Sequence, residues 1–228
     1  MFGYTIELYF YRQTESRSIM ELLDSLRWRY ATKQFDSQRK LSEAQVTQLL
    51  EAANLTATSY GLQPFKFLVL QDQAKQDQLV ASSYGQTQVA EASHVIVVAT
   101  RTDVDADYIG DYVKLMESQR GLPEGALDQY KTVMIGSLNS MDEQAIDAWA
   151  TKQAYLALST LLVACAVAKI DACPMEGFVA SEYDEMLGLS AMNLHAAVVL
   201  PIGYRAADDK HQNYKKVRRE LDDIVVRL

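Results

Sequence analysis

The segment Tyr155-Leu-Ala-Leu-Ser-Thr-Leu-Leu-Val-Ala-Cys-Ala-Val-Ala-Lys169 is the most apolar stretch of the chain. It is shorter than the roughly 20 apolar residues that cross a bilayer, and Ser159 and Thr160 interrupt it. A helix that is apolar on all sides but too short for a membrane is usually the buried centre of a domain. The stretch therefore predicts a core helix over roughly 142–168, in a protein with no membrane partner.

Strands and further helices are expected on both sides of this core helix. Apolar runs at 94–100 and 194–203 and the β-favouring segment 65–70 predict three strands, covered on both faces where the runs are continuous. Helical spacing and capping signals predict helices over 19–30, 42–53, 72–82 and 105–139, the last broken at 121–125. The elements lack the regular spacing of a doubly wound fold, so we expect an α+β, three-layer arrangement.

Composition excludes several classes of protein. Of 228 residues, 49% are hydrophobic and 23% charged, which is typical of a globular domain. Two cysteines cannot form a disulfide framework, and neither a CxxC pair nor a Cys/His cluster suggests a metal. The reducing cytoplasm is therefore the default location. A net charge of -8 argues against nucleic acid as a partner.

The first residues do not fit the pattern of the rest. Residues 1–19 mix aromatic and acidic residues and lack the basic region and apolar block of a signal peptide. The helical pattern begins around Ile19 and Met20. We therefore expect 1–19 to be an N-terminal extension that precedes the natural start, and 20–228 to form a single domain.

Basic residues gather in two segments of this acidic chain. Residues 27–40 contain Arg27, Arg29, Lys33, Arg39 and Lys40, and residues 210–219 contain Lys210, Lys215, Lys216, Arg218 and Arg219. If the two segments meet, they form a cationic pocket suited to a phosphate, because Arg and Lys make strong charge-assisted bonds to its oxygens. The alternative is two separate solvated faces.

The segment that follows the core helix is a weaker signal. In Cys173-Pro-Met-Glu-Gly-Phe178, Pro174 fixes the chain and Gly177 permits close backbone approach, so peptide N–H groups can face a flat ligand. A plain connection between elements explains it equally well. The chain contains no Walker loop, GxGxxG fingerprint or GxSxG elbow.

Six short motifs occur in a characteristic order. They are Arg29-Tyr-Ala-Thr-Lys-Gln-Phe35, Ser59-Tyr-Gly-Leu-Gln-Pro-Phe65, Glu91-Ala-Ser-His-Val-Ile-Val97, Trp149-Ala-Thr-Lys-Gln-Ala-Tyr-Leu156, Pro174-Met-Glu-Gly177 and Lys216-Val-Arg218. The succession resembles the FMN-dependent nitroreductase family, and most of all its oxygen-insensitive NAD(P)H nitroreductase and dihydropteridine reductase branch. The resemblance covers residues 20–228.

The resemblance implies a homodimer with a mostly antiparallel central sheet, flanked by helices, and two FMN sites at the subunit interface. Arg29 would contact the FMN phosphate and Lys33 the N1/O2 edge of the ring. The backbone of Pro174–Gly177 would face flavin N5, and Lys216 and Arg218 would close a phosphate clamp. The implied cofactor-binding residues are Arg29, Tyr30, Ala31, Thr32, Lys33, Thr58, Ser59, Gly85, Gln88, Pro174, Met175, Glu176, Gly177, Lys216 and Arg218, with Thr58 and Ser59 reaching in from the partner subunit.

The chain departs from the family pattern at three of these motifs. Ala31 stands where the family has Ser, which leaves only a backbone contact. Gly61 and Gly85 each stand where the family has Asn, so neither offers a side chain. Gln88 still can address the pyrimidine edge of the flavin.

The implied chemistry needs no catalytic side chain and no metal, because the cofactor carries it. NAD(P)H would deliver a hydride to tightly bound FMN and leave, and a small-molecule electron acceptor would then take its place in a ping-pong cycle. Nitroaromatics, quinones and pterins are the candidate acceptors, with Tyr108, Tyr112 and the turn at Pro123 as a wall above the flavin. The alternatives are a reductive dehalogenase or flavin-consuming enzyme on the same fold, and a non-catalytic binder of a phosphorylated metabolite.

Overall fold

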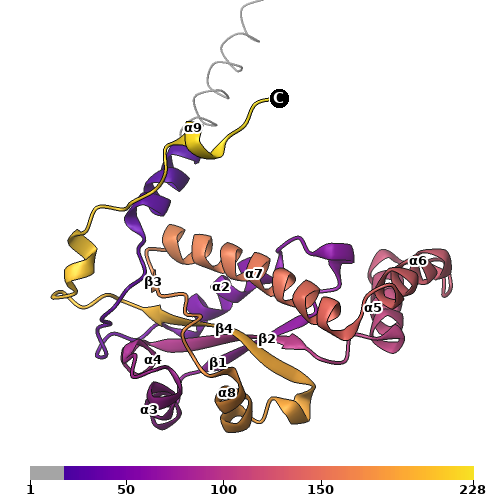
Figure 1. Ribbon diagram of the computed structural model, residues 1–228, viewed down its shortest axis with the longest axis horizontal. Coiled ribbons are helices and arrows are strands. Elements are labelled where there is room, and N and C mark those ends of the chain that lie inside the picture. The colour runs from indigo at the N-terminus through magenta and orange to yellow at the C-terminus, as the bar shows by residue number, and fades with distance from the viewer. Residues whose placement is uncertain (1–17) are drawn as a thin grey trace, which may run out of the picture.

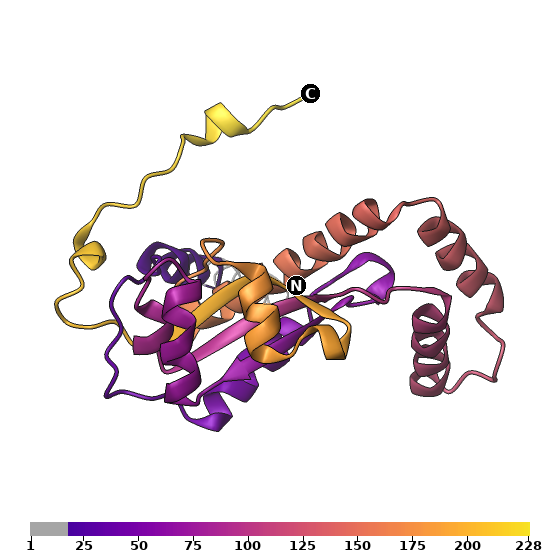
Figure 2. The ribbon, with the colours of Figure 1, turned by 60° about the horizontal axis from the view of Figure 1, so that its bottom comes forward.

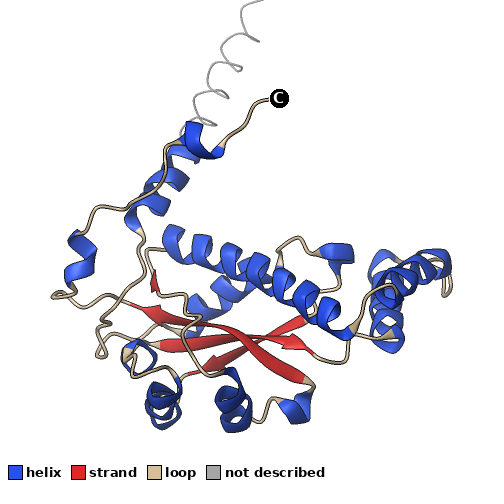
Figure 3. Cartoon of the chain, viewed as in Figure 1, coloured by secondary structure: helices blue, strands red, loops and turns tan. Residues whose placement is uncertain are grey.

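A four-stranded sheet lies at the centre of the computed structural model, which describes residues 18–228 (Figure 3). The strands run in the order β1-β2-β4-β3, and all neighbours are antiparallel. They are β1 (Phe65–Leu70), β2 (His94–Arg101), β3 (Asp171–Ala172) and β4 (Leu194–Gly203). β2 is buried along almost its whole length, because its apolar side chains have a helical layer on each side.

One face of the sheet is covered by α7 (Glu143–Val167) and α2 (Glu43–Asn54) (Figure 1). The Asp142 carboxylate caps the first turn of α7, and Ser42 and Gln45 form the predicted capping box of α2. Cys165 and Leu161 of α7 are fully buried in the core between the helices and the sheet. The predicted core helix is thus confirmed.

α7 is longer than the apolar stretch that marks it in the sequence. Its 25 residues, with a mean hydropathy of 1.3 in the most apolar window, would suffice by length and composition to cross a membrane. Eight of its residues are nevertheless buried inside the protein, mainly small ones that let the helix approach the sheet closely. This packing is that of a core helix.

The opposite face is covered by α3 (Gln73–Ser82), α4 (Gln88–Glu91) and α8 (Ala180–Leu187) (Figure 1). Tyr183 of α8 is completely buried, and its hydroxyl lies 2.8 Å from that of Ser83. The pairing satisfies the one polar group that this large side chain takes into the core. The sequence did not predict α4, α8 or the two-residue β3, which are too short for a periodic pattern.

The helical hairpin α5 (Ala106–Arg120) and α6 (Asp128–Asn139) packs at one end of α7 (Figure 2). Gly121 ends α5 with a φ of 63°, in the left-handed region that favours glycine. The predicted break at 121–125 is therefore confirmed. Short 3₁₀ turns complete this part of the fold at η1 (Ser59–Gly61) and η2 (Ser190–Met192).

The two ends of the described chain lie at the opposite end of the sheet. Residues 18–28 form a helix that leaves the body of the molecule, and the C-terminal segment with η3 (Lys210–Asn213) and α9 (Leu221–Ile224) also extends away from the body (Figure 1). The helix ends at residue 28, two residues earlier than the spacing predicts. The proposed extension 1–19 lies almost entirely outside the described residues.

Candidate cofactor-binding site

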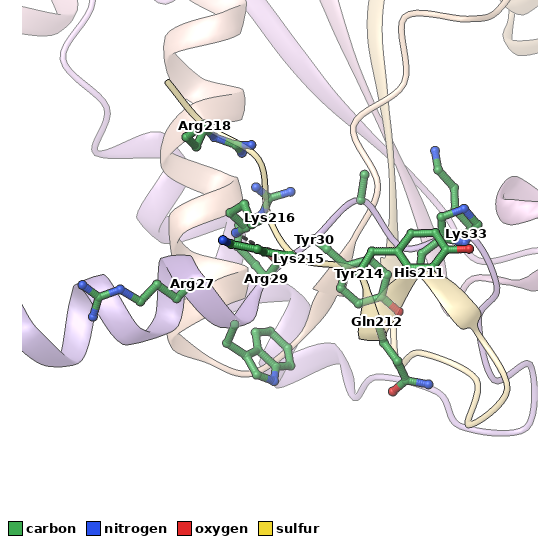
Figure 4. Close-up of a pocket in the computed structure, with 12 residues that line it drawn as sticks. Arg27, Arg29, Tyr30, Lys33, His211, Gln212, Tyr214, Lys215, Lys216 and Arg218 are labelled. Atoms are coloured by element: carbon green, nitrogen blue, oxygen red, sulfur yellow. Dashed lines mark hydrogen bonds between the residues drawn. The ribbon is translucent and has the colours of Figure 1, made fainter. Parts of the chain in front are cut away.

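The two basic segments meet in space, as their charge pattern predicts. They line a cavity of about 390 Å³ between the end of the 18–28 helix and the C-terminal segment (Figure 4). We call this cavity the cationic pocket, and its lining residues are Arg27, Trp28, Arg29, Tyr30, Ala31, Lys33, His211, Gln212, Tyr214, Lys215, Lys216 and Arg218. Arg39, Lys40, Lys210 and Arg219 do not line it. The alternative of two separate solvated faces is wrong for the residues that converge.

A buried carboxylate holds the two walls of the cationic pocket together. Asp209 is completely buried and accepts hydrogen bonds from the Tyr30 hydroxyl at 2.8 Å and from the Lys33 main-chain N–H at 2.9 Å. It also accepts from the main-chain N–H groups of Gln34 and His211. Burial alone would raise the pKa of Asp209, but these donors lower it to about 2. Sequence reasoning missed Asp209, which directly precedes the basic segment 210–219.

Arg29 is the unsatisfied group of the cationic pocket. Its half-buried guanidinium has no hydrogen-bond or ion-pair partner within residues 18–228. Burial, and after it the positive charge of Arg218, lowers its pKa. Burial and the charges of Arg29 and Arg218 likewise lower the pKa of Lys216. Because the three cations repel one another without a counter-ion from the described chain, the pocket carries an uncompensated positive charge that suits an anion.

Lys216 and Arg218 differ in their hydrogen-bond partners. The Lys216 ammonium donates to the carbonyls of Leu26 and Arg29, the latter at 2.5 Å, and so satisfies carbonyl groups at the end of the 18–28 helix. Arg218 is exposed and donates from Nη1 to the Val217 carbonyl at 2.6 Å. Lys216 therefore fixes the wall of the pocket, while most of the Arg218 guanidinium stays available to a ligand.

Lys33 connects the cationic pocket with the predicted N5-facing segment. Its Nζ lies 3.8 Å from the Sγ of Cys173, the residue that precedes Pro174. Burial raises the pKa of the Cys173 thiol, and the Lys33 charge opposes that shift only in part. The thiol is therefore neutral, and the Lys33 charge is left for a ligand.

The Pro174–Gly177 segment presents free main-chain donors. Met175 pairs with Val199 through both of its backbone groups. The N–H groups of Glu176 and Gly177, by contrast, have no acceptor in the described part of the chain. The Tyr155 hydroxyl of α7 donates to Glu176 Oε1 at 2.7 Å and anchors the segment on that side. The geometry fits the expected role of laying peptide N–H groups against a flat ligand.

The Gly85–Gln88 turn contacts the Pro174–Gly177 segment through Gln86, and not through either of the two predicted residues. Gln86 donates from Nε2 to the Gly177 carbonyl at 2.7 Å and to the Ser83 carbonyl at 3.0 Å. Gln88 is 6% exposed on α4, and Gly85 has a φ of 74° with open space beside it. Sequence reasoning named the two outer residues and missed Gln86, which supports the segment directly.

Besides the 174–177 segment, Gly85 and Gln88, three more predicted residues do not line the cationic pocket. Thr32 lies in the wall behind it and is completely buried, with no partner for its hydroxyl in the described residues. Thr58 and Ser59 lie in the turn beside η1, where the Ser59 N–H donates to Gln153 of α7 at 2.8 Å. They do not line the pocket of their own chain.

Comparisons with known proteins agree with this architecture. A family model described as the nitroreductase family matches residues 26–204. A Staphylococcus saprophyticus protein assigned as an NAD(P)H nitroreductase is 33% identical over 215 residues, which are 90% of this chain and 95% of that protein.

Solved structures show the same fold. A nitroreductase from Bacillus subtilis superposes with a TM-score of 0.83 at 19% identity, over 92% of this chain and all of that one. A nitroreductase from Exiguobacterium sibiricum, solved in complex with FMN, superposes with a TM-score of 0.76 at 24% identity, over 92% of this chain and 96% of that one. The three-layer fold expected from the motifs is thereby confirmed. With most of its length matched by the family model and a third of its residues identical to the staphylococcal relative, this chain belongs to the nitroreductase family of oxidoreductases.

Proposed function

We propose that the protein is an FMN-dependent oxidoreductase that uses NAD(P)H to reduce small-molecule electron acceptors. The observation that carries the proposal is the unpaired, half-buried Arg29 beside Arg218 in the cationic pocket. A phosphate group supplies the missing negative charge and oxygen acceptors for both guanidinium groups. The FMN bound in the Exiguobacterium relative and the NAD(P)H in the name of the staphylococcal relative support the choice of cofactor and co-substrate.

The remaining groups of the site suit the flavin ring. Lys33 provides a cation for the N1/O2 edge, and the free N–H groups of Glu176 and Gly177 provide donors for N5. When bound, FMN supplies the hydride chemistry, with NAD(P)H and the acceptor occupying the same place in turn. The residues of the chain bind and orient the cofactor and set the electrostatic potential around its ring. No side chain has to act as a nucleophile. We propose nitroaromatics, quinones and pterins as acceptors.

We further propose that the protein works as a homodimer. Apolar side chains are exposed along the outer side of α7 and α2, where Leu156 is 48%, Val167 57% and Leu55 84% exposed. A groove of about 570 Å³ runs between these two helices. Exposed apolar side chains of this kind on two neighbouring helices suit an interface with a second copy of the chain.

The two extended chain ends point to the same assembly. The C-terminal arm leaves the body of the molecule (Figure 2). Ile19 in the 18–28 helix is 52% exposed, and Val217 and Val226 of the arm are each 82% exposed. Apolar arms that leave the body of a domain gain stability by packing on a second copy. Thr58 and Ser59, which lie away from their own pocket, would then reach the FMN of the partner subunit.

The decisive test is titration of apoprotein with FMN, followed by NADH and NADPH oxidation with a quinone acceptor. We expect bound flavin, and turnover with at least one nucleotide. FMN binding without nucleotide oxidation would favour a reductive dehalogenase, a flavin-consuming enzyme or a non-catalytic binder. An apoprotein that binds inorganic phosphate but not FMN would overturn the proposal.

We also propose that the protein is located in the cytoplasm, with which its two buried cysteines, free of any disulfide, are compatible.

A further inference from the structure

The turn formed by residues 58–63 is held by the helices around it. The Tyr108 hydroxyl of α5 donates to the Leu62 carbonyl at 2.6 Å, and Gln153 of α7 accepts from the Ser59 N–H. Tyr60 packs edge-on against Tyr130 of α6, with ring centroids 6.2 Å apart. The turn and the three helices therefore form one packed unit.

The backbone of the turn is in an uncommon conformation. Tyr60, Gly61 and Gln63 have φ values of 58°, 74° and 46°, in the left-handed region. Residues other than glycine adopt this region at a cost, and such strain persists where the surrounding structure holds it. The turn is thus kept in a definite shape.

The Tyr112 side chain occupies the space in which a side chain at position 61 would lie. A Cβ atom added to Gly61 would lie 2.2 Å from the Tyr112 hydroxyl oxygen and 3.3 Å from its Cζ. No side chain fits there unless the tyrosine moves. The hydroxyl of α5 thus occupies the position from which a side chain at 61 would start.

The Tyr112 hydroxyl is available for a ligand. It has no hydrogen-bond partner among the described residues, although the side chain is half-buried. Burial raises its pKa, so the hydroxyl keeps its proton at neutral pH and can donate it in a hydrogen bond. It also lines a cavity of about 480 Å³ together with Gln63 and Tyr108.

We propose that Tyr112 is a cofactor-contacting residue, whose hydroxyl provides the hydrogen-bond donor that Gly61 lacks and directs it at the FMN of the partner subunit. The inference rests on the proposed function, because it requires that turn 58–63 faces a bound flavin in the dimer. The hydrogen-bond donor is then the Tyr112 hydroxyl of α5, and not a side chain of the 58–63 turn. This exchange would account for glycine where the family pattern has asparagine.

The test compares Tyr112→Phe with the matched control Tyr130→Phe, which removes a hydroxyl from the same aromatic cluster. The readouts are the FMN dissociation constant and the flavin midpoint potential. Loss of one neutral hydrogen bond should weaken FMN binding of Tyr112→Phe between about two- and tenfold. Tyr130→Phe should bind FMN as the wild type does.

A second pair of variants separates a ligand contact from mere packing. Gly61→Asn alone should weaken FMN binding and lower the melting temperature, because the new side chain meets the Tyr112 hydroxyl. In Gly61→Asn with Tyr112→Phe, only the ring Cζ remains near the new Cβ, at 3.3 Å, so a small shift of the ring admits the amide, which should restore FMN binding above that of either single variant. A structural role alone would not produce this rescue.

The outcomes are distinguishable from those of the proposed function. If the wild type binds no FMN, the proposed function falls and this inference falls with it. If the wild type binds FMN but Tyr112→Phe has unchanged affinity and potential, only the inference is overturned. Additive losses in the double variant would also overturn it.

Discussion

The Tyr30 hydroxyl donates a 2.8 Å hydrogen bond to the Asp209 carboxylate, across 179 positions of sequence. The bond ties the segment after the first helix to the segment after the last strand. Since the same carboxylate also accepts from the Lys33 and His211 backbone, one buried charge fixes both walls of the cationic pocket. The proposed anion-binding site is thus organised around a buried carboxylate of the protein itself.

Asp209→Asn should therefore destabilise the fold and weaken FMN binding together. The amide keeps one acceptor oxygen but turns an NH₂ group toward main-chain donors, a loss of roughly 1–3 kcal/mol. For a chain of this size that corresponds to a melting temperature lower by about 2–12 °C. Asp208→Asn, an exposed neighbour with the same change of charge, is the control and should melt like the wild type. Equal effects of the two substitutions in thermal denaturation would contradict the anchoring role.

The contribution of Asp209 should depend on pH in a defined direction. Its pKa is about 2 in the folded protein, against an ordinary value near 3.9 in the unfolded chain. Between these values the unfolded state binds the proton, so the stabilisation is complete above about pH 5 and is lost progressively as the pH falls toward 2. Urea unfolding of the wild type and Asp209→Asn should show a stability difference that shrinks from pH 5 to pH 3. A difference that stays constant would place the stabilisation elsewhere.

Arg29→Met should separate binding from stability. A half-buried charge beside Arg218 and Lys216 is unfavourable in the ligand-free protein, so its removal should not lower the melting temperature of the apoprotein. The same change removes a charged hydrogen bond worth roughly 1.5–3 kcal/mol, so FMN affinity should fall by about one to two decades. Fluorescence titration with FMN and thermal denaturation measure the two effects.

The control for Arg29→Met is Arg39→Met. Arg39 belongs to the same basic segment, but its guanidinium stacks 3.9 Å from the Tyr204 ring centroid, outside the cationic pocket. Its FMN affinity should equal that of the wild type. A similar loss in both variants would mean that net charge, not a specific contact, governs binding.

The fold was largely predictable because its main elements are long and strongly patterned. α7, β2 and β4 carry apolar runs, and α2 carries its capping box at Ser42. β3 has only two residues and pairs with β4 through long-range contacts, which no local pattern encodes.

The candidate site was predictable only in part, for the same reason. The charge pattern located Arg29, Lys33 and Arg218, because surface cations in an acidic chain stand out in sequence. Asp209 and Gln86 act by holding backbone groups of segments remote in sequence. Such contacts exist only after folding, and a single sequence contains no trace of the pairing.

Removal of the C-terminal arm should weaken the proposed dimer. A variant that ends at residue 218 keeps the basic residues of the pocket but loses the exposed Leu221, Ile224 and Val226. Burial of such side chains on a second copy is worth about 1.5–3 kcal/mol each when complete. Light scattering over a concentration series should show a dimer for the full chain and dissociation at higher protein concentration for the variant. Identical dissociation curves would mean that the arm lies outside the interface.

Lys33 should set the redox potential of the bound cofactor more than its affinity. A fixed cation next to the flavin ring favours the state that carries more negative charge, which is the reduced one. Lys33→Ala should therefore lower the midpoint potential, by about 30 mV for each 1.4 kcal/mol lost in a two-electron couple. FMN affinity should fall less than in Arg29→Met, because Lys33 lies beside Cys173, where we propose that the ring binds, and is not one of the proposed phosphate ligands. Lys40→Ala, whose ammonium binds the Ala92 carbonyl outside the pocket, is the control and should leave the potential unchanged. Spectroelectrochemical titration of both variants decides the matter, since an unchanged potential in Lys33→Ala would assign the ring edge to another group.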